Sequence, residues 1–198
     1  PGARPTLHHV SGGAIRLDVA GTLTLNGEIT ADATAGGEYD RGHGATGGSI
    51  YVTTSVLTGS GKFTADGYAN GTAQGSGGRI AVYYDDGAVY TGFTNSHATA
   101  GGSLAENGTA GFFDGSGTYP DLVVHEKFDF PADSVTHFGD LTVASGGVVS
   151  FGGGSVLTVH GSMLVTGSAE IVLQGKNTTG RVDGQWAGRG VAIYAEHR

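Results

Sequence analysis

The chain has little of several residue types that would narrow its function at once. Its 198 residues include no cysteine, four prolines, and ten lysines and arginines against 18 acidic residues. The absence of cysteine excludes a disulfide framework and a thiolate zinc site. A formal net charge of −8, with the basic residues scattered, argues against nucleic acid or an anionic membrane as a partner. No apolar run approaches the roughly 18 residues of a membrane-spanning helix, so we expect no membrane insertion.

Glycine, by contrast, is abundant, with 39 residues. The glycines separate short stretches in which apolar and polar residues alternate, which is typical of strands joined by tight turns. Charged residues make up only 14% of the chain, too few for the usual disordered composition. We therefore expect a folded, all-β protein.

Two phrases recur along the first half with the same internal phase. GGAIRLDV at 12–19 returns as GGSIYVT at 47–53 and as GGRIAVY at 77–83. NGEITAD at 26–32 returns as SGKFTAD at 60–66 and, in shorter form, at 91–95. A period of roughly 20–50 residues indicates a repeat architecture, and the alternation makes its units strands.

The repeat predicts which residues lie over one another in neighbouring units. Parallel pairing of equivalent strands would stack apolar side chains in interior columns. It also brings Glu28 beside Lys62 on the outer face. The predicted columns are Ile15, Ile50 and Ile80; Leu17, Val52 and Val82; and Ile29, Phe63 and Phe93.

These columns predict an all-β fold of the right-handed parallel β-helix type, a solenoid open at both ends. We expect one continuous β-helix over 1–198, with Gly-rich coils and long loops over 1–118 and tighter coils over 119–198. Because apolar alternation runs close to both ends, we interpret the chain as a window of a longer protein. Further coils or other copies would then complete the ladder.

Paired carboxylates are the first candidates for chemistry. Asp32 and Asp66 occupy the same phase in successive units, so their side chains are expected to be neighbours. Together they make a weak Ca²⁺ site, or one acquires a raised pKa as a general acid. The simpler interpretation is that each caps a turn at its strand end, as does Asp85-Asp86, in which case replacement of Asp32 or Asp66 by Asn changes little.

Histidines and outward hydroxyls are the remaining candidates. Eight histidines share no ligand spacing, so we expect solvated or turn residues rather than a metal site: His8, His9, His43, His97, His125, His137, His160 and His197. A polar face suited to glycan is the alternative to simple strand propensity for one set of residues. That set is Thr22, Thr24, Tyr51, Thr53, Thr54, Tyr83 and Tyr84.

Four stretches carry a resemblance to a known class of protein. GGAIRLDVAGTLTLNGEITADA, GGSIYVTTSVLTGSGKFTADG and GSGGRIAVYYDD resemble Gly-rich parallel β-helix segments of very large bacterial surface or secreted proteins. GDLTVASGGVVSFGGGSVLTVHGSMLVTG is similar to coils of the same adhesin-like and autotransporter-like proteins. The resemblance covers most of the chain. It implies an extracellular or cell-surface location, often in stalks or fibres, and it supplies no catalytic residues.

Three functions follow as hypotheses. The first is a structural segment of an extracellular β-helical stalk, fibre or filament, with no catalytic centre and no cofactor. The second is a carbohydrate-binding adhesin, which an aromatic outer patch would favour. The third is a polysaccharide lyase or hydrolase, which acids and bases meeting in an outer groove would favour.

Overall fold

The computed structural model describes residues 10–35, 43–87 and 89–195. These residues form 19 β-strands and one short 3₁₀ turn, η1 (Phe93–Asn95). No helix among them is long and apolar enough to cross a membrane.

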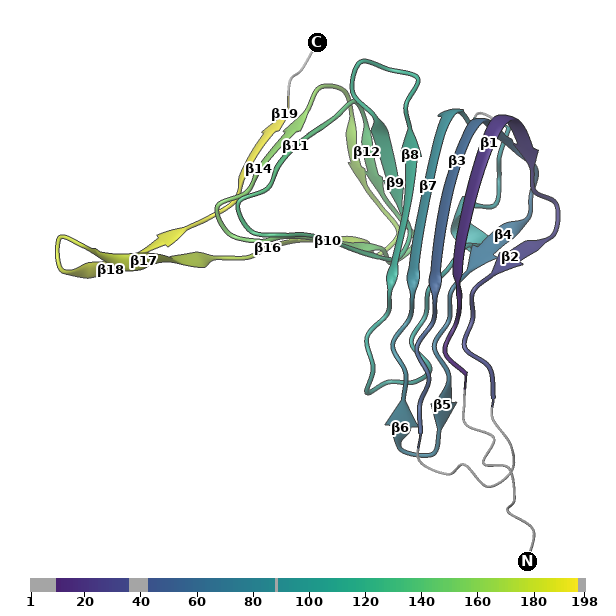
Figure 1. The fold of residues 1–198 in the computed structure, drawn as a ribbon. Coiled ribbons are helices and arrows are strands. Elements are labelled where there is room, and N and C mark those ends of the chain that lie inside the picture. Colours follow the sequence, from purple (N-terminus) through teal and green to yellow (C-terminus); the bar gives the residue numbers. More distant parts are fainter. Residues whose placement is uncertain (1–9, 36–42, 88, 196–198) are drawn as a thin grey trace, which may run out of the picture.

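The repeated phrases form the long strands of the first half. β1 (Ala14–Thr24), β3 (Ser49–Thr58), β7 (Arg79–Asp86) and β8 (Thr109–Asp114) pair in parallel, side by side (Figure 1). The second phrase forms a parallel pair, β2 (Glu28–Thr30) and β4 (Lys62–Thr64). Ile15 pairs with Ile50 and Ile50 with Ile80, as the repeat alignment predicts. Leu17, Val52 and Val82 follow in the same register.

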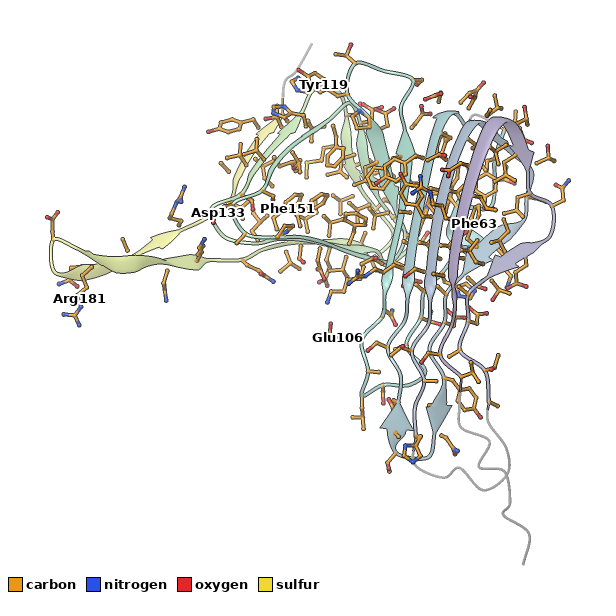
Figure 2. The ribbon with its side chains drawn as sticks, in the orientation of Figure 1. Phe63, Glu106, Tyr119, Asp133, Phe151 and Arg181 are labelled. Carbon is orange, nitrogen blue, oxygen red and sulfur yellow. The ribbon has the colours of Figure 1, made fainter. Side chains whose placement is uncertain are left out.

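The first hydrophobic core fills the space between these two groups of strands. Ile50, Val52 and Phe63 expose 2%, 0% and 0% of their surface, and Figure 2 shows Phe63 inside this part. Their equivalents in the first repeat, Ile15 and Ile29, are only partly buried because β1 and β2 lie at the edge.

The Gly-rich segments extend beyond the core as a thin projection. Its tip carries the antiparallel pair β5 (Ala69–Asn70) and β6 (Ala73–Gln74) (Figure 1). Backbones touch directly there: a Cβ on Gly75 would overlap the backbone of Ala45, and one on Gly67 would overlap that of Gly75. Glycine is therefore what allows two segments to pack without a core between them.

The second half contains shorter strands around a second core. Three sets pair in parallel: β9 (Asp121–Val124), β12 (Leu141–Val143) and β15 (Met163–Val165); β10 (Lys127–Phe130), β13 (Val148–Phe151) and β16 (Glu170–Leu173); and β11 (Val135–Phe138), β14 (Val156–Val159) and β19 (Ala192–Ala195). Phe151, labelled in Figure 2, is fully buried among them. The antiparallel hairpin of β17 (Lys176–Val182) and β18 (Gln185–Arg189) projects away from both halves (Figure 1).

The prediction of a right-handed parallel β-helix solenoid is wrong. The sheets are mixed and several are short: ten strands share one sheet, β11, β14 and β19 form another, and three pairs stand apart, so no solenoid closes. The continuity breaks at β8, which is parallel to β7 but antiparallel to β9. Phe112 and Phe113 are adjacent, so β8 has two apolar faces. Phe112 packs in the first core and Phe113 packs against the second. The two cores therefore lie on opposite faces of β8.

The predicted column Ile29, Phe63 and Phe93 is also broken. Ile29 pairs with Phe63, but Thr64 then pairs with His97 in the next segment. The turn η1 moves Phe93 off this register. Its ring packs edge-on against Tyr90 and Phe112 instead, with centroids 4.8 and 5.0 Å apart.

Candidate functional site

The candidate carboxylates form a column in which each side chain binds the backbone of the next repeat. Asp32 Oδ1 accepts the N–H of Asp66, with 2.6 Å between the atoms. Asp66 Oδ1 in turn accepts the N–H of Thr99 at 2.7 Å. At the ends of β2 and β4 these carboxylates therefore accept backbone N–H groups, as carbonyl oxygens do within the β-ladder.

Asp66 is the most heavily used member of this column. Its Oδ1 lies 2.8 Å from Thr99 Oγ1 and 2.8 Å from Nδ1 of His97, in addition to the Thr99 N–H. The side chains of Asp66 and His97 are 27% and 32% exposed. A half-buried carboxylate with three donors on one oxygen is held in a single orientation.

An ion pair and a hydroxyl extend the same face. Glu28 pairs with Lys62 in the β2–β4 register, and Lys62 Nζ lies 3.2 Å from Glu28 Oε1, which confirms the predicted neighbours. Thr64 Oγ1 is 3.0 Å from both Glu28 Oε1 and Asp32 Oδ2 and donates its one proton to either.

Glu126 completes the charged cluster from the second half. Burial raises the pKa of its carboxyl, and the nearby His97 opposes that rise. Asn107 Nδ2 donates to Glu126 Oε2 at 3.3 Å. The adjacent Lys127 pairs with Glu106 and Asp129, at 2.7 and 3.3 Å.

The cluster does not have the form of a cation site. Asp32 and Asp66 turn oxygens toward protein donors rather than toward a shared centre. Among residues 10–35, 43–87 and 89–195, no group of three or more His, Asp or Glu side chains is arranged to hold a metal ion. The capping interpretation of both aspartates therefore describes their geometry.

The same device recurs in the second half. Asp121 Oδ1 accepts the N–H of Asp140 at 2.6 Å, and Asp140 Oδ1 accepts the N–H of Ser162 at 2.6 Å. Burial raises the pKa of Asp121, with the Asp140 N–H opposing that shift. Two separate parts of the chain thus close their turns with a carboxylate column that ends in a hydroxyl residue.

Beside this second column lies a pair of imidazoles. His137 Nδ1 and His160 Nε2 are 3.2 Å apart, the ring centroids are 5.5 Å apart, and the planes differ by 17°. The rings therefore meet edge to edge through one N–H···N bond. Tyr119 stacks flat on His160 with centroids 3.8 Å apart. The two nitrogens face each other, so they do not converge on a metal position.

An aromatic column runs along the outer face of the first sheet. Arg16 lies over the Tyr51 ring at 5.4 Å, and Tyr51 and Tyr83 follow with centroids 5.4 Å apart. Tyr83 stacks on Phe113 at 4.6 Å and 10°, and Phe113 meets Phe128 edge-on at 5.8 Å. Phe113 therefore covers one face of the Tyr83 ring, while Tyr51 and Tyr83 remain 39% and 40% exposed.

Polar partners fix the start of this column. Arg16 Nε donates to Asp18 Oδ2 at 2.9 Å, and Thr53 Oγ1 donates to Asp18 Oδ1 at 2.9 Å. The Arg16 hydrogen bond lowers the pKa of Asp18. Two residues predicted for the outer polar face lie inside instead: Thr54 and Tyr84 are 6% and 5% exposed, and burial raises the pKa of Tyr84.

Sequence reasoning missed His97 and Glu126. His97 follows Thr64 by about one repeat and pairs with it in parallel. The turn η1 just before His97 breaks the repeat pattern, so the sequence alone does not show this pairing. Of the other histidines, His43 is exposed, His125 is half-buried with no hydrogen-bond partner on Nδ1, and His8, His9 and His197 lie outside the described residues. Asp85 and Asp86 are exposed at the end of β7, as a strand-end position predicts.

No protein-family model, curated protein or solved structure matches this chain.

Proposed function

We propose that the chain is a structural segment of an extracellular stalk or fibre protein, built from stacked strand units and without a catalytic centre. The observation that supports this is how the polar candidates are used. Asp32, Asp66, Asp121 and Asp140 each hold a backbone N–H of the next strand layer. Groups committed to such bonds stabilise the stack and are not free to transfer protons to a substrate.

The cross-strand contacts of the outer face support the same proposal. The stack from Arg16 through Tyr51 and Tyr83 to Phe113 joins four neighbouring strands. Cross-strand aromatic and cation–π pairs of this kind each contribute roughly 0.2–1 kcal/mol to a sheet. The extracellular location rests on the resemblance of the repeated phrases to bacterial surface proteins.

The second candidate is a glycan-binding face. Tyr51 and Tyr83 remain 39% and 40% exposed, so their hydroxyls and edges, with Arg16 and Asp18, offer hydrogen bonds to a sugar. One face of the Tyr83 ring, the kind of surface on which sugars stack, is already covered by Phe113. For this reason the structural function ranks first.

An activity and binding screen tests the two against each other and against an enzyme. The purified chain is incubated with acidic and neutral polysaccharides, and both turnover and retention are measured. The structural proposal expects neither. Retention that is lost in a Tyr51→Ala variant that still folds promotes the glycan face, and turnover that disappears in Asp66→Asn overturns the proposal in favour of an enzyme.

A further inference from the structure

The glycines of the repeat form two ladders, and among residues 10–35, 43–87 and 89–195 the first member of each ladder has no neighbour on one side. A Cβ on Gly48 would overlap the carbonyl oxygen of Gly13, and one on Gly78 would overlap that of Gly48. The second ladder is the same: Gly61 sits on the carbonyl of Gly27, and Gly92 on that of Gly61. Each later glycine is therefore required by the strand unit before it.

Gly13 and Gly27 have no such requirement within the described structure. A Cβ added at either position meets nothing within 4 Å, and neither residue has a positive φ. A glycine loses more backbone entropy on folding than any other residue, and at a position that is neither crowded nor strained nothing in the structure offsets that loss. The two positions make sense if another backbone carbonyl approaches each of them as Gly13 approaches Gly48.

The hydrogen bond made by the Asp32 N–H differs from those of the equivalent residues in the later units. Asp66 and Thr99 give their N–H groups to a carboxylate of the preceding unit at 2.6 and 2.7 Å. Asp32 gives its N–H to Thr30 Oγ1 of its own unit at a longer 3.2 Å. Asp32 thus uses a local substitute where its equivalents use a neighbour.

The burial of the apolar columns and the pairing of the edge strand β1 point to the same conclusion. Ile15, Leu17 and Ile29 are partly buried, whereas Ile50, Val52 and Phe63 beneath them are at most 2% exposed. β1 has eleven residues, and within the described residues it pairs only with β3. It carries neither proline nor an inward charge to block further pairing.

We propose that the β1/β2 edge receives one further strand unit of the same Gly-Gly type, paired in parallel and in the register of the β1–β3 ladder. The proposal rests on the proposed function, since it names the partner that such a stack takes. The occupant is a segment with a Gly-Gly phrase, an apolar residue at every second position and a second Gly-led strand ending in Ala-Asp. Its Asp would cap the Asp32 N–H, and its carbonyls would lie on Gly13 and Gly27.

The chain's own second unit is the probe. A labelled synthetic peptide of residues 47–66 is titrated into the whole protein, and binding is followed by fluorescence anisotropy. Binding by the wild-type protein is expected. Gly13→Ala and Gly27→Ala should each weaken it at least tenfold while leaving the unfolding midpoint unchanged, because both positions have room in the unbound protein. Gly188→Ala, on the distant hairpin and also with open space, should change neither.

Register is tested by disulfide trapping, which the cysteine-free chain permits without background. The protein carries Arg16→Cys and the peptide carries Tyr51→Cys or Thr53→Cys. Arg16 pairs with Tyr51 in the existing ladder, so the Tyr51→Cys peptide should cross-link at least tenfold faster.

Several results overturn the inference while leaving the structural function standing. These are failure of the wild-type protein to bind the peptide, equal binding by Gly13→Ala, equal trapping of both peptides, or dimerisation of the protein through β1 in place of peptide capture. Polysaccharide turnover would instead overturn the proposed function itself.

Discussion

Asp32 and Asp66 are neighbours through a side chain and a backbone group rather than through their two carboxylates. Oδ1 of Asp32 lies 2.6 Å from the backbone N of Asp66. The same relationship joins Asp66 to Thr99, Asp121 to Asp140, and Asp140 to Ser162. A carboxylate in this position fixes the register of two strand layers, because the bond forms only when equivalent residues are aligned.

Replacement of Asp66 should therefore have a graded effect on stability. Asp66→Ala leaves the Thr99 N–H and the His97 side chain without their acceptor, and we expect a loss of about 2–3 kcal/mol. Asp66→Asn keeps an oxygen at the same position and should cost less than about 1 kcal/mol. Urea unfolding measures both, with Asp85→Ala at an exposed strand end as the control expected to be silent. Equal losses for Asp66→Ala and Asp85→Ala would contradict the capping role.

The first glycine of each Gly-Gly phrase should be intolerant of a methyl group. A Cβ on Gly47 would overlap the carbonyl oxygen of Ala65, whose partner is the N–H of Gly78 at 2.7 Å. Gly47→Ala must displace backbone and should cost about 2 kcal/mol or more. Gly13→Ala, at the second glycine of the first phrase, has open space and should be neutral within about 0.5 kcal/mol. Thermal unfolding of the two variants makes the comparison, and equal effects would contradict the close approach of the Ala65 carbonyl to Gly47.

Position in the stack should set the cost of truncating an apolar column. Ile50 lies between Ile15 and Ile80 and is 2% exposed, so Ile50→Ala should cost about 3 kcal/mol. Ile15 is only partly buried, and Ile15→Ala should cost about 1 kcal/mol. Addition of the 47–66 peptide should increase the second value, because the bound unit would cover Ile15. Denaturant unfolding with and without peptide measures this coupling, and an unchanged value for Ile15→Ala would count against it.

The repeat made part of this structure predictable. The Gly-Gly phrase and the alternation from Ile15 to Leu17 fixed both the parity and the pairing partner of three long strands. Glu28 and Lys62 could be placed for the same reason. These features depend on local pattern and on contacts between equivalent residues, which a single sequence displays directly.

The side on which the core lies and the register after Phe93 depend on tertiary packing that the repeat pattern does not show. At Phe112 and Phe113 both faces of β8 become apolar. Phe112 packs in the first core and Phe113 against the second, so the two cores lie on opposite faces of β8. The turn at Phe93 shifts the register by which His97 reaches Asp66. In both places tertiary packing decides between alternatives that are locally equivalent, so the prediction of a parallel β-helix was wrong even though the local pattern supported it.

His125 should give the stability of the protein a specific dependence on pH. Burial lowers the pKa of its imidazole, and Nδ1 has no hydrogen-bond partner. The folded state therefore binds a proton at this ring less readily than the unfolded chain does, whose imidazole has the ordinary pKa of about 6.5. Because the unfolded state then binds more protons, the free energy of unfolding falls as the pH drops below that value.

The measurement compares the wild-type protein with His125→Gln at pH 7.5 and 5.5. The variant should lose part of the decrease that the wild type shows between these values. Glu126 supplies the opposite sign, because burial raises the pKa of its carboxyl and the folded state then binds more protons in acid. Glu126→Gln should therefore make the protein more sensitive to acid relative to the wild type, in the range where the carboxyl titrates. A His125→Gln profile that runs parallel to the wild-type profile would show that this imidazole does not control the response.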